Sequence, residues 1–404
     1  MPRWLTLLGG AAAALAASAS CASPDAPPRA PRPGKRWLPP GSIIGGYAPT
    51  CNSTSGTDQK VLQAVRDGVN FLYWFSINLV ATNNASGAPA PGVSSGLDLA
   101  CIARVMAQLT AEGLNTTHVV TVGGWDAPHP VTDFTPAAMY EAWRRWNEDV
   151  VGAAHGFTFD GIDWDMEGFD DPADPNNAFT VACLDLVGQV SQLAQADGFI
   201  VTLVPPESYL DPTTSTYDRS LLWPYPEWHS EFRYHGHNAY AMLLAKYATT
   251  QLAGGASVPT YDLVAVQFYE SWSHADYNLT AAPVVQTVAQ YLSAWVPRIV
   301  NGWLVDFSAD PPSNLPSQVV RVPASTLILG LANGWAGVPK SVLMMPGDLG
   351  EAWAALAGVG CVPRGAMFWD IDDEGATPVN QSEPLFLARG LNAFLHTRGA
   401  RGAP

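Results

Sequence analysis

The sequence has few basic residues. Its 404 residues include 20 lysines and arginines against 36 aspartates and glutamates, which gives a formal net charge of −16 at pH 7. A chain of this sign repels the phosphates of nucleic acids and the anionic surface of membranes. The composition therefore argues against nucleic acid and membrane partners and favours a neutral ligand.

Cysteine is scarce, and the C-x2-C and H-x3-H spacings of structural zinc sites are missing. We therefore expect neither a metal nor a cofactor. Cys51, Cys101, Cys183 and Cys361 lie in the part of the chain expected to fold, and an even number is compatible with disulfides in an oxidising compartment. The sequence leaves their pairing open.

The apolar run at the N-terminus, from Leu5 to Ala19, is shorter than the ~20 residues that a membrane-spanning helix needs. Arg3 precedes it and small residues follow it, which is the order of a secretory signal peptide. The same residues fit a membrane anchor, or lipidation at Cys21, less well than they fit a signal peptide. We expect a secreted protein, most simply a monomer, whose segments are a signal peptide (1–20), a Pro/Ala-rich linker (21–40), one folded domain (41–398) and a tail (399–404).

Short apolar or aromatic runs alternate with amphipathic helical stretches throughout residues 41–398, as in repeated βα units. Eight such runs predict a closed (β/α)8 (TIM) barrel of the α/β class. An open doubly wound sheet is the rival architecture, but the first run is not followed by the glycine-rich phosphate loop of that fold. The candidate strands cover residues 43–48, 71–78, 118–122, 157–167, 199–204, 263–269, 326–331 and 366–371.

The segment FDGIDWDMEG (159–168) is the most informative stretch of the chain. Residues two apart in a strand share a face, so Asp163, Asp165 and Glu167 are expected to point into the barrel, roughly 6.6 Å apart, while Trp164 and Met166 face the helices. Carboxylates so close raise one another's pKa, so that at least one holds a proton near neutral pH. A glycosidase needs this arrangement: a neutral acid for the leaving oxygen and an ionised neighbour for the developing cation.

Calcium binding is the alternative interpretation of the same residues. Asp163, Asp165, Glu167, Gly168 and Asp174 fall at positions 1, 3, 5, 6 and 12 of an EF-hand-like loop. However, the last ligand is Asp instead of Glu, and the preceding residues resemble a strand instead of a helix.

At this point the sequence resembles the family 18 glycoside hydrolases, the chitinase family. The signature D-G-x-D-x-D-x-E matches in full from Asp160 to Glu167, and three weaker matches, VVTVGGW (119–125), VQFYE (266–270) and GAMFWDID (365–372), fall on the third, sixth and eighth strands. Only about thirty residues separate the seventh and eighth strands, so the resemblance is to plant- and fungal-type barrels without the extra α+β insertion.

The resemblance implies hydrolysis of β-1,4-linked N-acetylglucosamine with retention, in which the substrate's own acetamido group is the nucleophile. It implies that Glu167 is the acid and base, that Asp165 orients the acetamido N–H, and that Asp163 shares a proton with Asp165. Tyr269 is expected to bond the acetamido oxygen and Trp369 to form the floor of the sugar subsite. Gln267, Gly124, Trp125 and Asp160 are the other expected substrate-binding residues.

Two further functions stay open: an endo-β-N-acetylglucosaminidase that cleaves the chitobiose core of N-glycans, and an inactive chitinase-like lectin. Glu270 departs from the family, which more often has Asn or Asp there. The long connection over residues 205–261 is expected to form a side wall, with Trp223, Tyr225 and Trp228 in it. Its pair His235 and His237 is expected to bond locally, and Trp272 and Trp335 are expected either to stack on sugars or to pack in loops.

Overall fold

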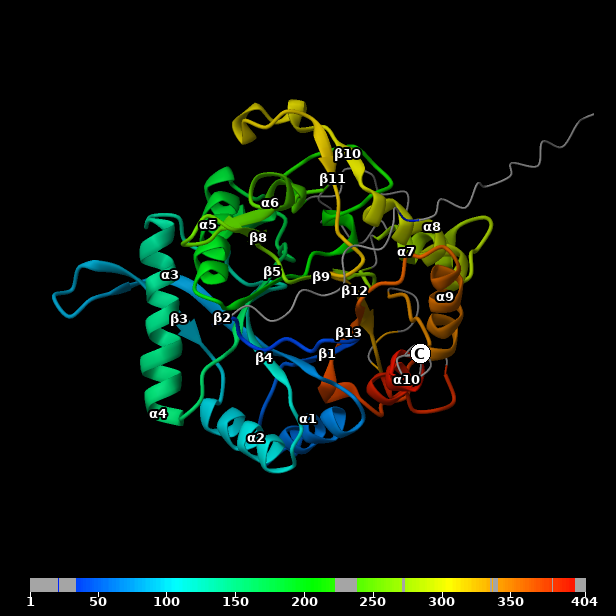
Figure 1. The fold of residues 1–404 in the computed structure, drawn as a ribbon, viewed down its shortest axis with the longest axis horizontal. Coiled ribbons are helices and arrows are strands. Elements are labelled where there is room, and N and C mark those ends of the chain that lie inside the picture. The colour runs from blue at the N-terminus through cyan, green and yellow to red at the C-terminus, as the bar shows by residue number, and fades with distance from the viewer. Residues whose placement is uncertain are drawn as a thin grey trace, which may run out of the picture.

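The computed structural model describes residues 21, 34–221, 238–270, 273–334, 336, 341–379 and 381–396. Within them the chain folds as a (β/α)8 barrel, as the alternating pattern predicts. Figure 1 shows the strands near the centre of the molecule with the helices around them. Among these described residues, no helix has the length and apolarity needed to cross a membrane.

Eight parallel strands close the barrel because β1 pairs with both β2 and β13. Their order around the barrel follows the chain. The strands are β1 (Ile43–Ala48), β2 (Phe71–Asn83), β4 (Thr117–Gly124), β5 (Gly161–Met166), β6 (Ile200–Leu203), β9 (Leu263–Gln267), β12 (Leu327–Ala332) and β13 (Gly365–Trp369). Each overlaps one of the eight runs read from the sequence.

Helices cover the outside of the barrel. The longer ones are α1 (Thr57–Arg66), α2 (Leu99–Ala111), α3 (Pro136–Arg145), α5 (Val181–Ala196), α8 (Val288–Asn301), α9 (Pro346–Gly358) and α10 (Leu387–Leu395). Several begin at a side chain that accepts a bond from the first turn, such as Thr135 before α3, Thr180 before α5 and Thr287 in a capping box before α8. A π-helical segment (Trp146–Gly152) joins α3 to α4 (Ala153–His155).

Three antiparallel strand pairs, counted over the described residues, extend from the barrel. The end of β2 turns back as β3 (Pro89–Ser95), and this hairpin projects from the body at the left of Figure 1. The others are β7 (Thr249–Gln251) with β8 (Ser257–Pro259), and β10 (Trp303–Val305) with β11 (Gln318–Val320). In the described part of the connection between β12 and β13, α9 is the one regular element.

The connection from β6 to β9 contributes a short helix, α6 (Ala241–Lys246), where the sequence NAYAMLLAKY predicts one. Within residues 273–281, α7 (His274–Asp276) and a second π-helical segment (Tyr277–Ala281) follow β9. Single 3-10 turns cover Pro175–Asn177, Glu207–Tyr209, Phe307–Ala309, Pro311–Ser313 and Ile371–Asp373.

The barrel separates two apolar layers. The larger lies between strands and helices and includes Trp164 and Met166 from β5. The smaller fills the barrel interior with residues such as Tyr47, Tyr73 and Met367. Interior side chains of this kind make a TIM barrel a packed core, which leaves the C-terminal ends of the strands for chemistry.

The four cysteines of residues 41–398 do not all pair with one another. Cys51 pairs with Cys101, but Cys361 pairs with Cys21, and Cys183 is a buried free thiol on α5. Lys35 also contacts the barrel, with its Nζ 2.7 Å from Oδ2 of Asp262. Residues that the sequence assigns to the linker therefore touch the folded unit.

Candidate active site

β5 presents its three acids to the inside of the barrel, as the two-residue period predicts. Asp163 meets residues of β1, β4 and β6 there. The intervening Trp164 points the other way, and its Nε1 donates to Oγ of Ser191 on α5 at 2.9 Å. Glu167 lies just past the C-terminal end of the strand and is 9% exposed.

Asp163 is the deepest of the three acids, with no exposed surface. Its carboxyl accepts bonds from the hydroxyls of Tyr47 at 2.7 Å, Thr121 at 2.9 Å and Thr202. Burial raises the pKa of Asp163 to about 6, while the three hydroxyl donors oppose this rise. These donors fix the carboxyl at the base of the acid column.

Asp165 and Glu167 hydrogen-bond to each other through their side chains. Burial raises the pKa of both, and the charge of Glu167 adds to the rise at Asp165; the pKa of Glu167 reaches about 7. Nε2 of Gln267 donates to Oδ1 of Asp165 at 2.8 Å, which favours the ionised form of that carboxyl. The pair is therefore built to hold one proton near neutral pH.

Two aromatic residues border the acids. Tyr269 is half-buried, and burial followed by the charges of Asp165 and Glu167 raises its pKa well above the ordinary value, so its phenol keeps its proton. Trp369 is also half-buried, and its ring packs at 5.4 Å from Tyr47 and 4.8 Å from Phe75, measured between centroids. A phenol donor thus lies near the proton-sharing pair, and an apolar ring packs on Tyr47, which bonds the deepest acid.

The glycine pair at the end of β4 allows the close approach of its neighbours. Gly123 and Gly124 have φ of 101° and 109°, a region that favours glycine. A Cβ on Gly123 would overlap the backbone oxygen of Asp165, and one on Gly124 would overlap the ring of Phe75. Because Gly124 has no side chain, the ring of Phe75 fits against its backbone and packs on Trp369.

The two other expected binding residues lie at different ends of the barrel. Trp125 follows β4, is half-buried, and donates from Nε1 to Oδ1 of Asp170 at 3.1 Å. Asp160 precedes β5 and accepts a bond at 2.8 Å from the backbone N–H of His118, at the start of β4. The six residues of β5 lie between it and Glu167, a distance of roughly 20 Å, so the structure places Asp160 at the opposite end of the barrel.

The calcium interpretation does not fit these positions. Asp163 and Asp165 lie within a strand, and Asp174 accepts a bond from the backbone N–H of Asn176 at 2.8 Å. No group of three or more His, Cys, Asp or Glu side chains that could hold a metal ion occurs among the described residues. Residues 163–174 therefore do not form an EF-hand-like loop.

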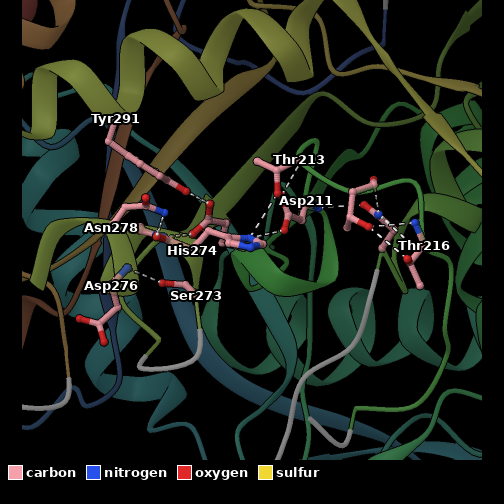
Figure 2. Close-up of polar contacts among 12 residues, drawn as sticks. Asp211, Thr213, Thr216, Ser273, His274, Asp276, Asn278 and Tyr291 are labelled. Atoms are coloured by element: carbon pink, nitrogen blue, oxygen red, sulfur yellow. Dashed lines mark hydrogen bonds and ion pairs between the residues drawn. The ribbon is translucent and has the colours of Figure 1, made fainter. Parts of the chain in front are cut away.

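A second polar network lies near Glu167, and the sequence did not reveal it. Glu270 is buried, and its Oε1 accepts a bond at 3.2 Å from the backbone N–H of Glu207. Glu207 in turn accepts from the hydroxyl of Tyr291, and Asp211 lies 2.5 Å from Nδ1 of His274. Figure 2 shows Asp211 and His274 side by side, with Tyr291 reaching in from α8.

Burial raises the pKa of Glu270 well above its ordinary value, and the nearby charges of Glu167 and Glu207 add to the rise. Burial likewise raises the pKa of Glu207 to about 7. The rise favours the protonated form of Glu270, which carries a donor hydrogen that an Asn would also supply. Tyr47, Thr202 and Glu207 share no local motif with the acidic segment, so single-sequence reasoning missed them.

Several residues of the expected site lie outside the described residues. They are Trp223, Tyr225, Trp228, His235, His237, Trp272 and Trp335.

Comparison with known proteins gives structural neighbours alone. Neither a protein-family model nor a curated protein sequence matches the chain. The solved structures that match include a fungal endo-β-N-acetylglucosaminidase from glycosyl hydrolase family 18, with 15% identity, coverage of 88% of this chain and 98% of that one, and a TM-score of 0.49. A family 18 chitinase from Pseudoalteromonas aurantia matches with 13% identity, coverage of 88% and 100%, and a TM-score of 0.47.

A tamarind chitinase-like lectin is a third neighbour, with 12% identity, coverage of 82% and 95%, and a TM-score of 0.41. The assignment of the fold rests on the chain's own strand order.

Proposed function

We propose that this protein is a secreted, retaining glycoside hydrolase of the family 18 type, which cleaves β-1,4-linked N-acetylglucosamine in chitin or its oligosaccharides. The observation that carries the proposal is the hydrogen-bonded pair of Asp165 and Glu167, buried at the C-terminal end of β5 with raised pKa values. The C-terminal face is where the catalytic groups of TIM barrels lie.

The contact between the two carboxyls favours substrate assistance over a protein nucleophile. Retaining enzymes with a carboxylate nucleophile hold their two carboxyls about 5 to 5.5 Å apart, on either side of the scissile bond. Asp165 and Glu167 are hydrogen-bonded to each other, which leaves no room for a sugar between them. Burial raises the pKa of Glu270, which disfavours the ionised form that a nucleophile needs.

In the proposed reaction Glu167 gives its proton to the glycosidic oxygen as the bond to the anomeric carbon breaks. The acetamido carbonyl oxygen of the substrate attacks the same carbon and forms an oxazolinium ion. Asp165 accepts the acetamido N–H and stabilises the positive charge, and the phenol of Tyr269 bonds the acetamido oxygen. Water, deprotonated by Glu167, then attacks the anomeric carbon and restores the acetamido group with retained configuration.

Secretion is part of the proposal. It is supported by the apolar N-terminal run and by two disulfides, which persist in oxidising compartments.

The test is a substrate panel of chitin oligosaccharides and high-mannose glycopeptides, with the product anomer followed by NMR. We expect cleavage of the chitin oligosaccharides with the β-anomer released first, and we expect Glu167→Gln to keep ligand binding but lose turnover. Cleavage of glycopeptides alone identifies the endo-β-N-acetylglucosaminidase. Binding without cleavage by the wild type identifies the lectin.

A further inference from the structure

The hydrogen-bond ladder between β5 and β6 stops one step short of Glu167. Its last described bond runs from the N–H of Val204 to the carbonyl of Trp164 at 3.0 Å. In a continued parallel ladder, Met166 would donate to the carbonyl of Val204 and accept from the N–H of residue 206. Neither bond is made: the N–H of Met166 points elsewhere, the carbonyl of Val204 accepts from Gln267 Nε2 at 2.8 Å, and residue 206 is a proline, which has no N–H to donate.

A single phenol takes the place of both missing partners. The N–H of Met166 donates to Oη of Tyr240 at 2.7 Å, and the same hydroxyl donates to the carbonyl of Met166 at 3.0 Å. Met166 is the residue between Asp165 and Glu167, so its two peptide groups connect the acids. Buried peptide groups without partners are costly, and this phenol satisfies both.

Tyr240 is itself held firmly. Its side chain has no exposed surface, and its ring packs against Phe179 and Tyr209, with centroids 5.7 and 6.4 Å away. Its backbone N–H donates to the carbonyl of Tyr209 at 3.0 Å. The phenol therefore has little freedom to follow a moving strand end.

Asn238, two residues before Tyr240, is buried and has a φ of 55°. Asn238 accepts from the N–H of Asp211 at 2.8 Å and donates to the carbonyls of Thr216 at 2.9 Å and Thr214 at 3.2 Å. Figure 2 shows Asp211 and Thr216 in this network, with Asp211 beside His274. The connection after β6 is thus bonded at several points to the turn that presents Tyr240.

We propose that Tyr240 is a positioning residue for the catalytic acid: it substitutes for a strand partner of Met166 and so sets the contact between Glu167 and Asp165. The inference rests on the proposed function for its effect on turnover, but the geometry it describes is independent of turnover. Tyr240 does not touch the reacting atoms in this role and acts through the Met166 peptide.

The experiment compares Tyr240→Phe with Tyr217→Phe. Both changes remove one buried phenol from the same connection, but the hydroxyl of Tyr217 donates to the sulfur of Met242 at 3.6 Å and not to β5. The first readout is kcat and KM on a chitin oligosaccharide. We expect Tyr240→Phe to lower kcat roughly 10- to 100-fold with KM within about 3-fold, since displacement of a catalytic group by about 1 Å costs this much. Tyr217→Phe should match the wild type.

The second readout is a carboxyl titration by 13C NMR, which does not require turnover. In Tyr240→Phe the two titration steps of the Asp165–Glu167 pair should move together by roughly half a pH unit or more, because a looser pair interacts less. If Tyr240→Phe shows no cooperative thermal transition, Asn238→Gly, which keeps the positive φ, takes its place with the same expected direction. An unchanged titration overturns the inference, whereas a wild type that cleaves nothing overturns the proposed function alone.

Discussion

Gln267 connects the acid column to a neighbouring strand: its Nε2 lies 2.8 Å from Oδ1 of Asp165 and 2.8 Å from the carbonyl oxygen of Val204. Gln267 is the last residue of β9, and it is 1% exposed. Its amide therefore orients Asp165 and stabilises the ionised carboxyl that the proposed reaction needs, and it also bonds the side chain of Glu167.

Gln267→Met should remove this donor with little change in volume. We expect kcat to fall roughly 10- to 100-fold, because the charged form of Asp165 loses a buried hydrogen bond of about 1.5 to 3 kcal/mol. The control is Gln195→Met, which removes another buried amide, bonded to Thr260 and Asp262 on the outer side of the barrel. Steady-state kinetics decide the matter, and equal kcat values for the two variants would show that Gln267 has no part in turnover.

The pH dependence of kcat/KM should reflect the pair of Asp165 and Glu167. Since the pKa of Glu167 is raised to about 7, activity should hold through the weakly acidic range and fall as pH rises above about 7, where Glu167 loses its proton. An ordinary carboxyl would lose its proton near pH 4.5. The measurement is a profile from pH 4 to 9 on an oligosaccharide.

An aryl glycoside with an acidic phenol provides the control for this profile. Its leaving group needs little protonation, so its rate should fall less steeply on the alkaline side. If both substrates keep full rates beyond pH 8.5, Glu167 does not act as the acid.

The local part of the site could be predicted from sequence, and the part across the barrel could not. The period of two in FDGIDWDMEG correctly orients Asp163, Asp165 and Trp164, because strand geometry alone fixes it. The partners Tyr47 and Thr202 come from strands far away in the sequence, and only the closed barrel brings them to Asp163.

A sequence motif does not show which of its residues lie in the active site when the motif spans a whole strand. Asp160 belongs to the same signature as Glu167, yet the whole of β5 separates the two, so one motif covers both ends of the barrel. Tyr240 was expected only as part of a side wall. Its contact with Met166 depends on Pro206 and on a turn at Asn238, neither of which forms a recognisable pattern.

Gly124→Ala should cost both stability and activity. The new Cβ would overlap the ring of Phe75, which packs against Trp369 at 4.8 Å, and φ at this position is 109°. We expect a loss of about 2 to 4 kcal/mol in the free energy of unfolding, from backbone strain and overpacking together. Denaturant unfolding measures the loss of stability, and an increase in KM measures the loss of activity.

Gly113→Ala is the matched control, because Gly113 also has a positive φ of 72° but no atom within 4 Å of a Cβ. It should lose about 1 kcal/mol from strain alone and leave KM unchanged. Equal losses in the two variants would mean that Phe75 moves aside without cost.

The disulfide pattern predicts one free thiol in a chain that retains Cys21. Cys183 is buried on α5, and burial raises its pKa to about 12, so the native protein should resist alkylation. In denaturant without reductant, intact mass should increase by one alkyl group. Cys183→Ser should abolish that increase, and a gain of three groups would contradict one of the two disulfides.

The stability of the fold should decrease as pH rises through the weakly acidic range, and Glu374 should account for part of the decrease. Its carboxyl accepts the backbone N–H groups of Leu387 at 2.8 Å and Ala388 at 3.3 Å, but burial outweighs these donors and raises its pKa from 4.5 to about 7. The folded state therefore binds this proton more tightly than the unfolded state, so the contribution of Glu374 to stability falls between pH 4.5 and 7 and is constant outside that window. A pKa shift from 4.5 to about 7 corresponds to about 3 kcal/mol in the free energy of unfolding.

Glu374→Gln, which resembles the protonated acid at every pH, should equal the wild type near pH 4.5 and exceed its unfolding free energy by up to about 3 kcal/mol at pH 8. Denaturant unfolding at a series of pH values measures the difference. Glu351→Gln, at an exposed position on α9, should follow the wild-type curve throughout. If the Glu374→Gln curve runs parallel to that of the wild type, Glu374 ionises alike in the folded and unfolded states, and its burial has no energetic consequence for the α10 contact.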